Sequence, residues 1–567
     1  MAIKSFRLML GAAIVAGLVA TGPVQSQGFS GAYLAAQRAF SDNDYPTAAR
    51  YYSRALTQDP TNTDLMEKAI LAYLGNGDID RALAVARRLT GQGPAFQIAN
   101  MLLVAAAANS QNYGEGVDLL SAGEAIGPLV DGLALAWMQV GQGDMNQALD
   151  TFQEVSTRDG LQSFGQFHKA LALAFVGDFE GALGILNGET GPQIPQTRRG
   201  IIAHAQILSQ LERNDDALAL VGSVPNVATD PALSAVQDRL NAGETLEFTA
   251  IRSANDGLAE VFYSVAGALS GEANDGYTLL FTRVAEYLRP DHVDSILLTA
   301  QLLEQLGRYD LATIAYDRIA RDDPAFQAAE LGRAEALRLS GNSDAAIEVL
   351  EQLAEAYAEL PNIHVTLGDD YRRLERYDEA TGAYDKAVAL YGDPQPSQWV
   401  LYYTRGITHE RMNRWDLAEA DFRTALALQP DQPQVLNYLG YSFVEQQINL
   451  DEALGMIESA VAARPNDGYI TDSLGWVLYR MGRYGDAVNH MERAVELKAV
   501  DPIINDHLGD VYWAVGRLRE AEFQWNRALS FEPEDEDAVR IRRKLEVGLD
   551  LVLEEEGAEP ITFADEG

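Results

Sequence analysis

The sequence of 567 residues predicts an all-α fold, a solenoid built from about fourteen stacked helix pairs. Three regularities predict it. A small residue recurs at steps of 34 to 38 residues in the second half of the chain, an alanine follows most of these positions twelve residues later, and a proline follows several of them 24 residues later. The small residues are Ala266, Ala300, Ala334, Gly368, Gly406, Gly440, Gly475 and Gly509.

Residues 437–465 show why the repeat predicts helix pairs. Apolar or small residues recur there at intervals of three and four, which is the period of one helix face. Gly440 and Ala453 carry little or no side chain, so we expect the two helices to approach closely at these positions. The polar stretch 446–451 is the expected turn, and Pro465 ends the unit because proline cannot continue a helix interior.

A 34-residue unit with a small residue in each of two helices and a proline at its end resembles the tetratricopeptide repeat (TPR). The resemblance implies a right-handed superhelix in which the first helix of each pair lines a concave surface. It also implies a protein that binds partners on that surface rather than an enzyme.

The repeats divide the chain into segments. Residues 27–225 form a degenerate N-terminal array of about six units that stays in phase with the rest. Residues 226–258 break the rhythm, and residues 259–533 form the regular C-terminal array. A helix over residues 534–553 has one apolar face and is the expected polar-faced cap of the solenoid. The acidic tail, residues 554–567, is expected to be disordered.

The irregular segment predicts one helix, Pro231–Asn241, and then an extended loop over residues 243–257, which has no helical period and glycines at both ends. One interpretation is a spacer between the two arrays. The other is a loop that folds against the solenoid and contacts a partner through Glu247, Phe248 and Arg252, since long loops in compact architectures are often functional.

The first 26 residues have the features of a secretory signal peptide. Lys4 and Arg7 precede an apolar run, residues 8–20, that is too short to span a membrane comfortably, and small residues precede a cut after Ser26. The alternative is an uncleaved anchor in the inner membrane. No later segment is long and apolar enough to span a bilayer.

Composition excludes several classes of site and partner. The chain has no cysteine, which excludes disulfides, thiolate metal sites and a lipid-bearing N-terminal cysteine. Together with the signal this indicates an exported protein of the bacterial periplasm, or one associated with the outer membrane without a lipid anchor. The formal net charge is −40, and it becomes −42 without Lys4 and Arg7, so nucleic acid and anionic lipid are not expected partners.

The sequence carries no pattern typical of catalysis or cofactor binding. It contains no GxxxxGK[ST] or GxGxxG phosphate-binding loop, no HExxH and no GxSxG. Its seven histidines are scattered, and the many carboxylates form close pairs by chance. We therefore expect no catalytic, cofactor-binding or metal-binding residues, and no enzyme activity.

Partner binding is expected on the concave face of the last units. In the TPR fold, residues three before, one after and four after each small anchor point inward. TPR domains that clamp a chaperone's terminal carboxylate use lysine and asparagine three before and one after the anchor. No lysine is present at these positions here, so a carboxylate clamp is not expected. For the tryptophans, packing between helices is the alternative to binding. The candidate partner-binding residues are Asn437, Tyr441, Asp472, Trp476, Tyr479, Asp506, Asp510 and Trp513.

The residues from Leu436 to Tyr441, from Ile448 to Leu454 and from Asp472 to Trp476 resemble the C-terminal repeats of long exported TPR proteins of proteobacteria. Some of these are adaptors for a periplasmic carboxyl-terminal processing protease. The resemblance implies a protein-binding scaffold or adaptor of the cell envelope, with such a protease or an envelope assembly factor as partner. The alternatives are a chaperone-like holder of exported chains and a glycan-binding or polysaccharide-export module.

Overall fold

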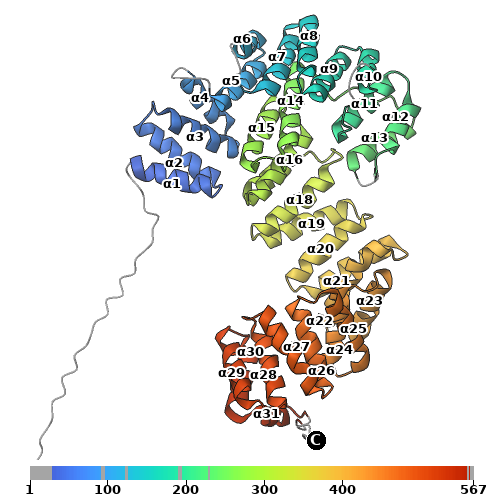
Figure 1. Cartoon of the computed structure of the whole chain (residues 1–567). Helices are drawn as coiled ribbons and strands as arrows, with labels where there is room; N and C mark the ends of the chain where they lie inside the picture. The colour runs from blue at the N-terminus through green and yellow to red at the C-terminus, as the bar shows by residue number, and fades with distance from the viewer. Residues whose placement is uncertain are drawn as a thin grey trace, which may run out of the picture. The chain divides into compact units, whose positions relative to one another are not determined.

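The computed structural model describes residues 29–558 and 561, except 91–95, 122–125, 190–193, 226 and 228–229. The expected signal peptide and most of the acidic tail lie outside the described residues. The described part contains 31 α-helices and no strand, which confirms the all-α solenoid (Figure 1). Six helix pairs, α1 to α12, precede the single helix α13, and eight pairs, α14 to α29, follow it in chain order.

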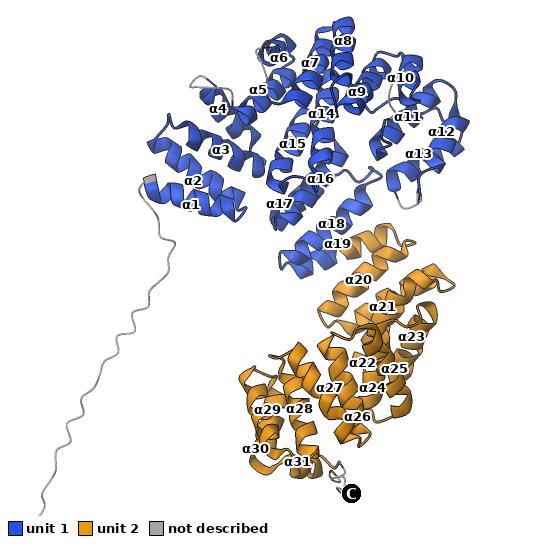
Figure 2. Ribbon diagram, in the orientation of Figure 1, with its two compact units in different colours: residues 1–349 blue, residues 350–567 orange. Residues whose placement is uncertain are grey.

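The chain divides into two compact units, residues 1–349 and 350–567, and the boundary falls within helix α19 (Ser343–Ala356) (Figure 2). The helices before α19 are α1 (Phe29–Ser41), α2 (Tyr45–Gln58), α3 (Thr63–Gly75), α4 (Ile79–Leu89), α5 (Gln97–Asn109), α6 (Tyr113–Ser121), α7 (Pro128–Gln142), α8 (Met145–Ser156), α9 (Gln162–Phe175), α10 (Phe179–Leu186), α11 (Arg198–Gln210), α12 (Asn214–Gly222), α13 (Pro231–Asn241), α14 (Ala254–Leu269), α15 (Asp275–Leu288), α16 (Val293–Gln305), α17 (Tyr309–Tyr316) and α18 (Phe326–Leu339).

The second unit continues with regular pairs and two terminal helices. A short 3₁₀ turn, Pro396–Gln398, lies in the longest repeat step, the 38 residues from Gly368 to Gly406. The α-helices are α20 (Pro361–Arg373), α21 (Tyr377–Tyr391), α22 (Trp399–Arg411), α23 (Trp415–Leu428), α24 (Pro433–Glu445), α25 (Leu450–Ala463), α26 (Gly468–Arg480), α27 (Tyr484–Leu497), α28 (Pro502–Ala514), α29 (Leu518–Ser530), α30 (Asp535–Val547) and α31 (Leu549–Glu555).

The small anchors pack where the two helices of a pair meet, as the sequence predicts. A Cβ on Gly440 would lie 2.8 Å from Cγ1 of Ile457, and one on Gly509 would lie 2.4 Å from Nε1 of Trp525. Distances this short leave no space for a side chain, so each glycine permits a close helix contact. Trp525 itself is fully buried against this contact.

Helices α14 and α15 cover the inner face of the first array, a contact that the repeat pattern does not predict. Helix α14 packs along α7 and also contacts α5 and α9, while α15 contacts α3 and α5. One hydrophobic core joins α1 to α9 with α14 and α15. A Cβ on Gly257 of α14 would lie 2.2 Å from the ring of Trp137 on α7. The chain therefore fills this part of its own concave surface.

Two boundaries differ from the expected ones. Helix α14 begins at Ala254, inside the loop expected over 243–257, because Ser253 caps it by accepting a hydrogen bond from the backbone N–H of Asp256. The expected cap helix is broken at Gly548, whose φ of 85° lies in the left-handed region, and α31 extends to Glu555 in the expected tail.

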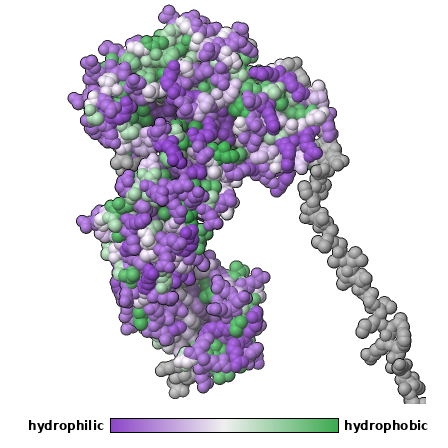
Figure 3. All heavy atoms as spheres, turned by 180° about the vertical axis from the view of Figure 1, so that it is seen from behind, coloured by the Kyte–Doolittle hydropathy of each residue, from purple (hydrophilic) through white to green (hydrophobic). Residues whose placement is uncertain are grey.

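The surface is mainly polar. On the face shown in Figure 3, hydrophilic residues predominate and hydrophobic residues form small separated patches. This agrees with the excess of acidic over basic residues, 83 against 43. Among the described residues, no helix combines the length and the apolar character needed to cross a bilayer.

Candidate protein-binding groove

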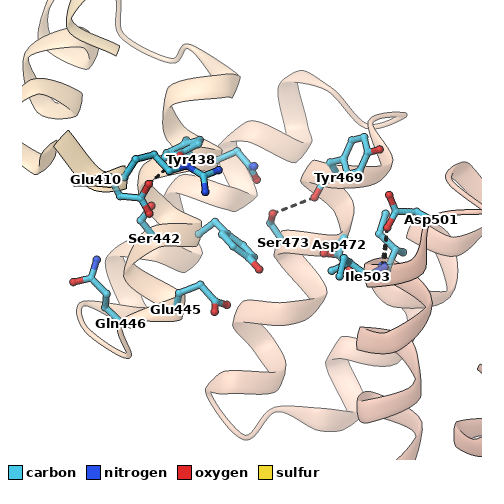
Figure 4. A pocket seen from close by; sticks show the side chains of 14 residues that line it. Glu410, Tyr438, Ser442, Glu445, Gln446, Tyr469, Asp472, Ser473, Asp501 and Ile503 are labelled. Atoms are coloured by element: carbon cyan, nitrogen blue, oxygen red, sulfur yellow. Dashed lines mark hydrogen bonds between the residues drawn. The ribbon is translucent and has the colours of Figure 1, made fainter. Parts of the chain in front are cut away.

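A groove of about 520 Å³ opens on the second unit, where the first helices of four successive pairs meet (Figure 4). Its walls are α22, α24, α26 and the start of α28. Unlike the inner face of the first array, it is not filled by other helices of its unit. Its lining residues are Glu410, Arg411, Asn437, Tyr438, Tyr441, Ser442, Glu445, Gln446, Tyr469, Asp472, Ser473, Asp501, Ile503 and Ile504.

The groove brings together three of the residues predicted from the repeat positions. Asn437 and Tyr441 lie one helical turn apart on α24 and are half-buried, while Asp472 on α26 is buried. The side-chain oxygen Oδ1 of Asn437 is buried and makes no hydrogen bond within the described part of the chain. An unsatisfied acceptor of this kind favours a bound hydrogen-bond donor.

Three tyrosines give the groove its aromatic surface. Tyr438 donates a hydrogen bond from its hydroxyl to Oε2 of Glu410 over 3.2 Å. Burial, with the charges of Glu445 and Asp472, raises the pKa of Tyr441, so its hydroxyl stays protonated at neutral pH. The ring of Tyr469 is about half exposed. These rings offer flat apolar contacts that still carry a polar group.

Trp476 and Tyr479 are buried in a stack of rings instead of facing the groove. The ring centre of Trp476 lies 3.9 Å from that of His507 and 4.7 Å from that of Tyr479, and both rings are nearly parallel to it. Its Nε1 donates to Oε1 of Glu445 over 2.8 Å. Trp476 therefore orients a groove carboxylate while contributing little surface of its own.

His507 connects this stack to the acidic wall of the groove. Its Nδ1 lies 3.1 Å from Oδ2 of Asp472. Burial alone would lower the pKa of His507, but the charge of Asp472 and its hydrogen bond outweigh burial, and the pKa is raised. A charged imidazolium is thus favoured beside Asp472.

The predicted residues of α28 are held by the C-terminal helices. Nζ of Lys544, on α30, donates to the carboxylates of Asp506 and Asp510 over 2.7–2.9 Å and is fully buried. Nε1 of Trp513 donates to Asp550 of α31 over 3.0 Å. The predicted residues Asp506, Asp510 and Trp513 therefore already have partners within the chain.

The predicted contact loop lies in the first unit and runs along α11. The backbone N–H of Leu246 donates to Oγ of Ser209 over 2.8 Å, and Leu246 is buried. Glu247 is exposed, and Phe248 is half-buried, with its ring 6.2 Å from that of Phe179. Arg252 is exposed and forms ion pairs with Asp256 and Asp291.

Glu410 lies four residues after the anchor Gly406, at an inward position of the unit before the last three. The repeat positions do not identify Tyr438, Glu445, Tyr469 and Asp501 as groove residues. The helical period could have identified two of them, Tyr438 and Glu445. Tyr438 lies three residues before Tyr441 and Glu445 four residues after it, so both share the stripe of Tyr441 on α24. In the described part of the chain, the groove included, no group of three or more histidine and carboxylate side chains is arranged to hold a metal ion.

Three family models described as tetratricopeptide repeats match the sequence: one at residues 39–107, one at 359–431, and one at 281–361, 403–468 and 473–536. Together they match more than half of the chain. A TPR repeat-containing protein of Pseudomonas aeruginosa is 30% identical over 179 residues, which are 30% of this chain and 29% of that protein. The match therefore spans less than a third of the relative's length.

Two solved structures illustrate the structural comparison. The Cut9–Hcn1 hetero-tetramer of the APC/C covers 92% of this chain with 97% of its own, at 13% identity and a TM-score of 0.37. A tetratricopeptide repeat protein from Parabacteroides merdae covers 45% of this chain with 98% of its own, at 15% identity and a TM-score of 0.37. By its helix pairs and its sequence matches, the chain belongs to the tetratricopeptide repeat family.

Proposed function

We propose that this protein is a non-catalytic scaffold or adaptor of the bacterial cell envelope that binds a segment of a partner protein in the groove of its second unit. Tetratricopeptide repeat proteins generally present such surfaces to protein partners. The observation that carries the proposal is the groove itself, which combines tyrosine rings with the unsatisfied oxygen of Asn437. Aromatic anchors beside well-placed polar groups are typical of protein recognition.

An extended segment suits this groove best. Four successive first helices line it, so a bound chain can run across them and meet a new set of side chains at each step. The half-buried amide of Asn437 can pair with a backbone N–H of such a segment once it turns its buried Oδ1 toward the groove, because an extended chain leaves its backbone donors free.

The proposal includes a location for the protein, the periplasm. The basic residues Lys4 and Arg7, the apolar run that follows and the absence of cysteine support export to the periplasm. The resemblance of the C-terminal repeats supports a processing protease or an envelope assembly factor as the partner. Fractionation of cells that express the tagged full-length chain tests this, and recovery in the cytoplasm would contradict it.

Affinity capture from the source bacterium tests the groove. The tagged full-length chain is compared with Asn437→Ala/Tyr441→Ala and with the matched control Tyr391→Ala/Asn526→Ala, whose residues are exposed and lie outside the groove. We expect one abundant partner that the control retains and the groove variant loses. Capture of many unrelated exported proteins would favour the chaperone-like holder. Equal capture by both variants would refute the role of the groove.

A further inference from the structure

We infer that the partner segment is basic: lysine or arginine side chains of an extended segment meet the carboxylates of the groove in the second unit. This inference rests on the proposed function, because it assumes that the groove binds a protein segment, and it adds the chemistry of that segment. The groove carries four carboxylates, those of Glu410, Glu445, Asp472 and Asp501, against the single guanidinium of Arg411.

Three of the four groove carboxylates lack cationic partners. Within the described part of the chain, Glu410, Glu445 and Asp501 form no ion pair, and Asp472 is paired only with the buried His507. Other acids of the same unit are neutralised. Asp421 pairs with Arg405, Glu452 with Arg423 and Glu492 with Arg517, all at 2.7–2.9 Å. The unit therefore leaves an excess of negative charge at its groove.

Neutral donors nevertheless hold the three unpaired carboxylates in place. Glu410 accepts from the hydroxyl of Tyr438, and Glu445 accepts from the indole of Trp476. Asp501 caps α28 by accepting from the backbone N–H groups of Ile503 and Ile504, each over 3.0 Å. A carboxylate that is oriented but not neutralised binds a cation with little loss of side-chain freedom.

The positions of the acids suit a segment that crosses the groove. In Figure 4, Glu410 and Glu445 lie on one side of it, and Asp472 and Asp501 lie on the other. A basic segment passing between them meets carboxylates on both sides. The rings of Tyr438 and Tyr441 on α24 also line the groove and offer aromatic surface for cation–π contacts. Nζ of Lys498 already lies 4.7 Å from the ring centre of Tyr469, so this ring has such a contact within the chain.

Charge complementarity excludes the opposite occupant. An acidic segment would bring like charges together in a groove with one arginine and four carboxylates, and would lose affinity for that reason. The net charge of −40 extends the preference beyond contact distance, because the field of the whole protein attracts basic chains and repels acidic ones.

A displayed library of random decapeptides tests the inference on the full-length chain. Selection is run in parallel on the unmodified protein, on Glu410→Gln/Glu445→Gln, and on the control Glu458→Gln/Glu522→Gln. The control removes the same charge from exposed residues of α25 and α29 that form no ion pair within the described chain. Glutamine keeps the acceptor oxygens that Tyr438 and Trp476 use, and thermal melting monitored by circular dichroism checks that each variant is folded.

We expect enrichment of peptides rich in lysine and arginine on the unmodified and control proteins. Fluorescence anisotropy of selected peptides should show a loss of affinity of about three- to tenfold in the groove variant, as for two exposed ion pairs. Groove-dependent peptides without basic residues would overturn the inference and leave the proposed function standing. The selected peptides are also measured on Asn437→Ala/Tyr441→Ala, and if this variant binds every one of them as well as the unmodified protein does, both the inference and the proposed function are overturned.

Discussion

His168 of the first unit is buried, and one of its ring nitrogens carries no proton. Nε1–H of Trp137 donates to its Nδ1 over 3.2 Å, so Nδ1 must be unprotonated. Its Nε2 is buried and makes no hydrogen bond in the described chain. Burial lowers the pKa of His168 to about 4, and burial with the nearby charge of Arg213 lowers that of His204 to about 4.

These two histidines make the first unit sensitive to acid. The unfolded chain binds a proton at each near pH 6.5, whereas the folded chain binds one only near pH 4, so the stabilising contribution is complete above pH 6.5 and is lost as pH falls towards 4. For the fully buried His168 the loss is on the order of 3 kcal/mol. Urea denaturation between pH 7.5 and 4.5 should show a shallower pH dependence for His168→Gln than for the unmodified chain. Equal slopes would contradict the neutral buried state.

Gly475 tests the close contact within a helix pair. A Cβ at this position would lie 2.2 Å from Sδ of Met491 and 3.3 Å from its backbone nitrogen. Met491 can move its side chain but not its backbone, so Gly475→Leu should lower the free energy of unfolding by about 1–3 kcal/mol. Gly485→Leu on α27 is the control, because nothing lies within 4 Å of a Cβ there. Thermal melting measures both, and equal melting temperatures would refute the contact.

The residues of the groove were only partly accessible to prediction. The repeat positions selected Asn437, Tyr441 and Asp472, which the groove brings together. The same positions selected Trp476, which stacks on His507, and Asp510, which pairs with Lys544. A repeat position specifies the direction of a side chain, whereas the neighbouring helix determines whether that side chain is covered.

At the scale of helices, the repeat spacing predicts which helices pair, because each pair is local in sequence. It does not predict that α14 packs against α7, since that contact depends on which apolar face the rest of the chain leaves uncovered. The start of α14 had a readable signal, because Ser253 and Asp256 have the spacing of a helix cap before an apolar run. The break at Gly548 serves a long-range contact, since a Cβ there would lie 2.7 Å from the ring of Trp513.

Lys544 attaches the terminal helix α30 to the last helix pair through buried charge. Lys544→Met would leave Asp506 and Asp510 buried without their main counter-charge, and we expect a loss of about 3–5 kcal/mol in the free energy of unfolding at pH 7. Burial already raises the pKa of Asp506 in the unmodified chain. The charge of Lys544 offsets part of this increase, and the charge of Asp510 adds to it. Urea denaturation of the variant and of the unmodified chain measures the difference.

The pH dependence separates lost charge pairing from lost packing. Without Lys544 the carboxyl of Asp506 should bind its proton at higher pH in the folded state, so the deficit of the variant should shrink as pH falls from 7 to 5. Lys386→Met on α21 is the control, because this lysine is exposed and should change little. A deficit that is constant with pH would show that the loss comes from packing alone.

At the scale of the whole molecule, the net charge of −40 opposes folding and favours basic partners. Salt should therefore act on the two properties in opposite directions. Screening of like charges should raise the melting temperature by a few degrees between about 0.02 and 0.3 M KCl, because the Debye length falls from about 20 Å to about 6 Å. The same change should weaken binding of a basic peptide to the groove, because the exposed carboxylates there are screened while buried pairs such as Lys544 with Asp510 are not.

Melting curves and fluorescence anisotropy in the same KCl series measure the two trends on one protein. The control peptide has the same sequence with lysine and arginine replaced by glutamine, and its affinity should change little with salt because it carries no charge for the groove to attract. Glu410→Gln/Glu445→Gln should flatten the salt dependence of basic-peptide binding and leave that of melting nearly unchanged, since it removes two of 83 acidic residues. If salt weakens binding equally with and without Glu410 and Glu445, the attraction belongs to the molecule's overall charge, and the groove carboxylates do not select the partner.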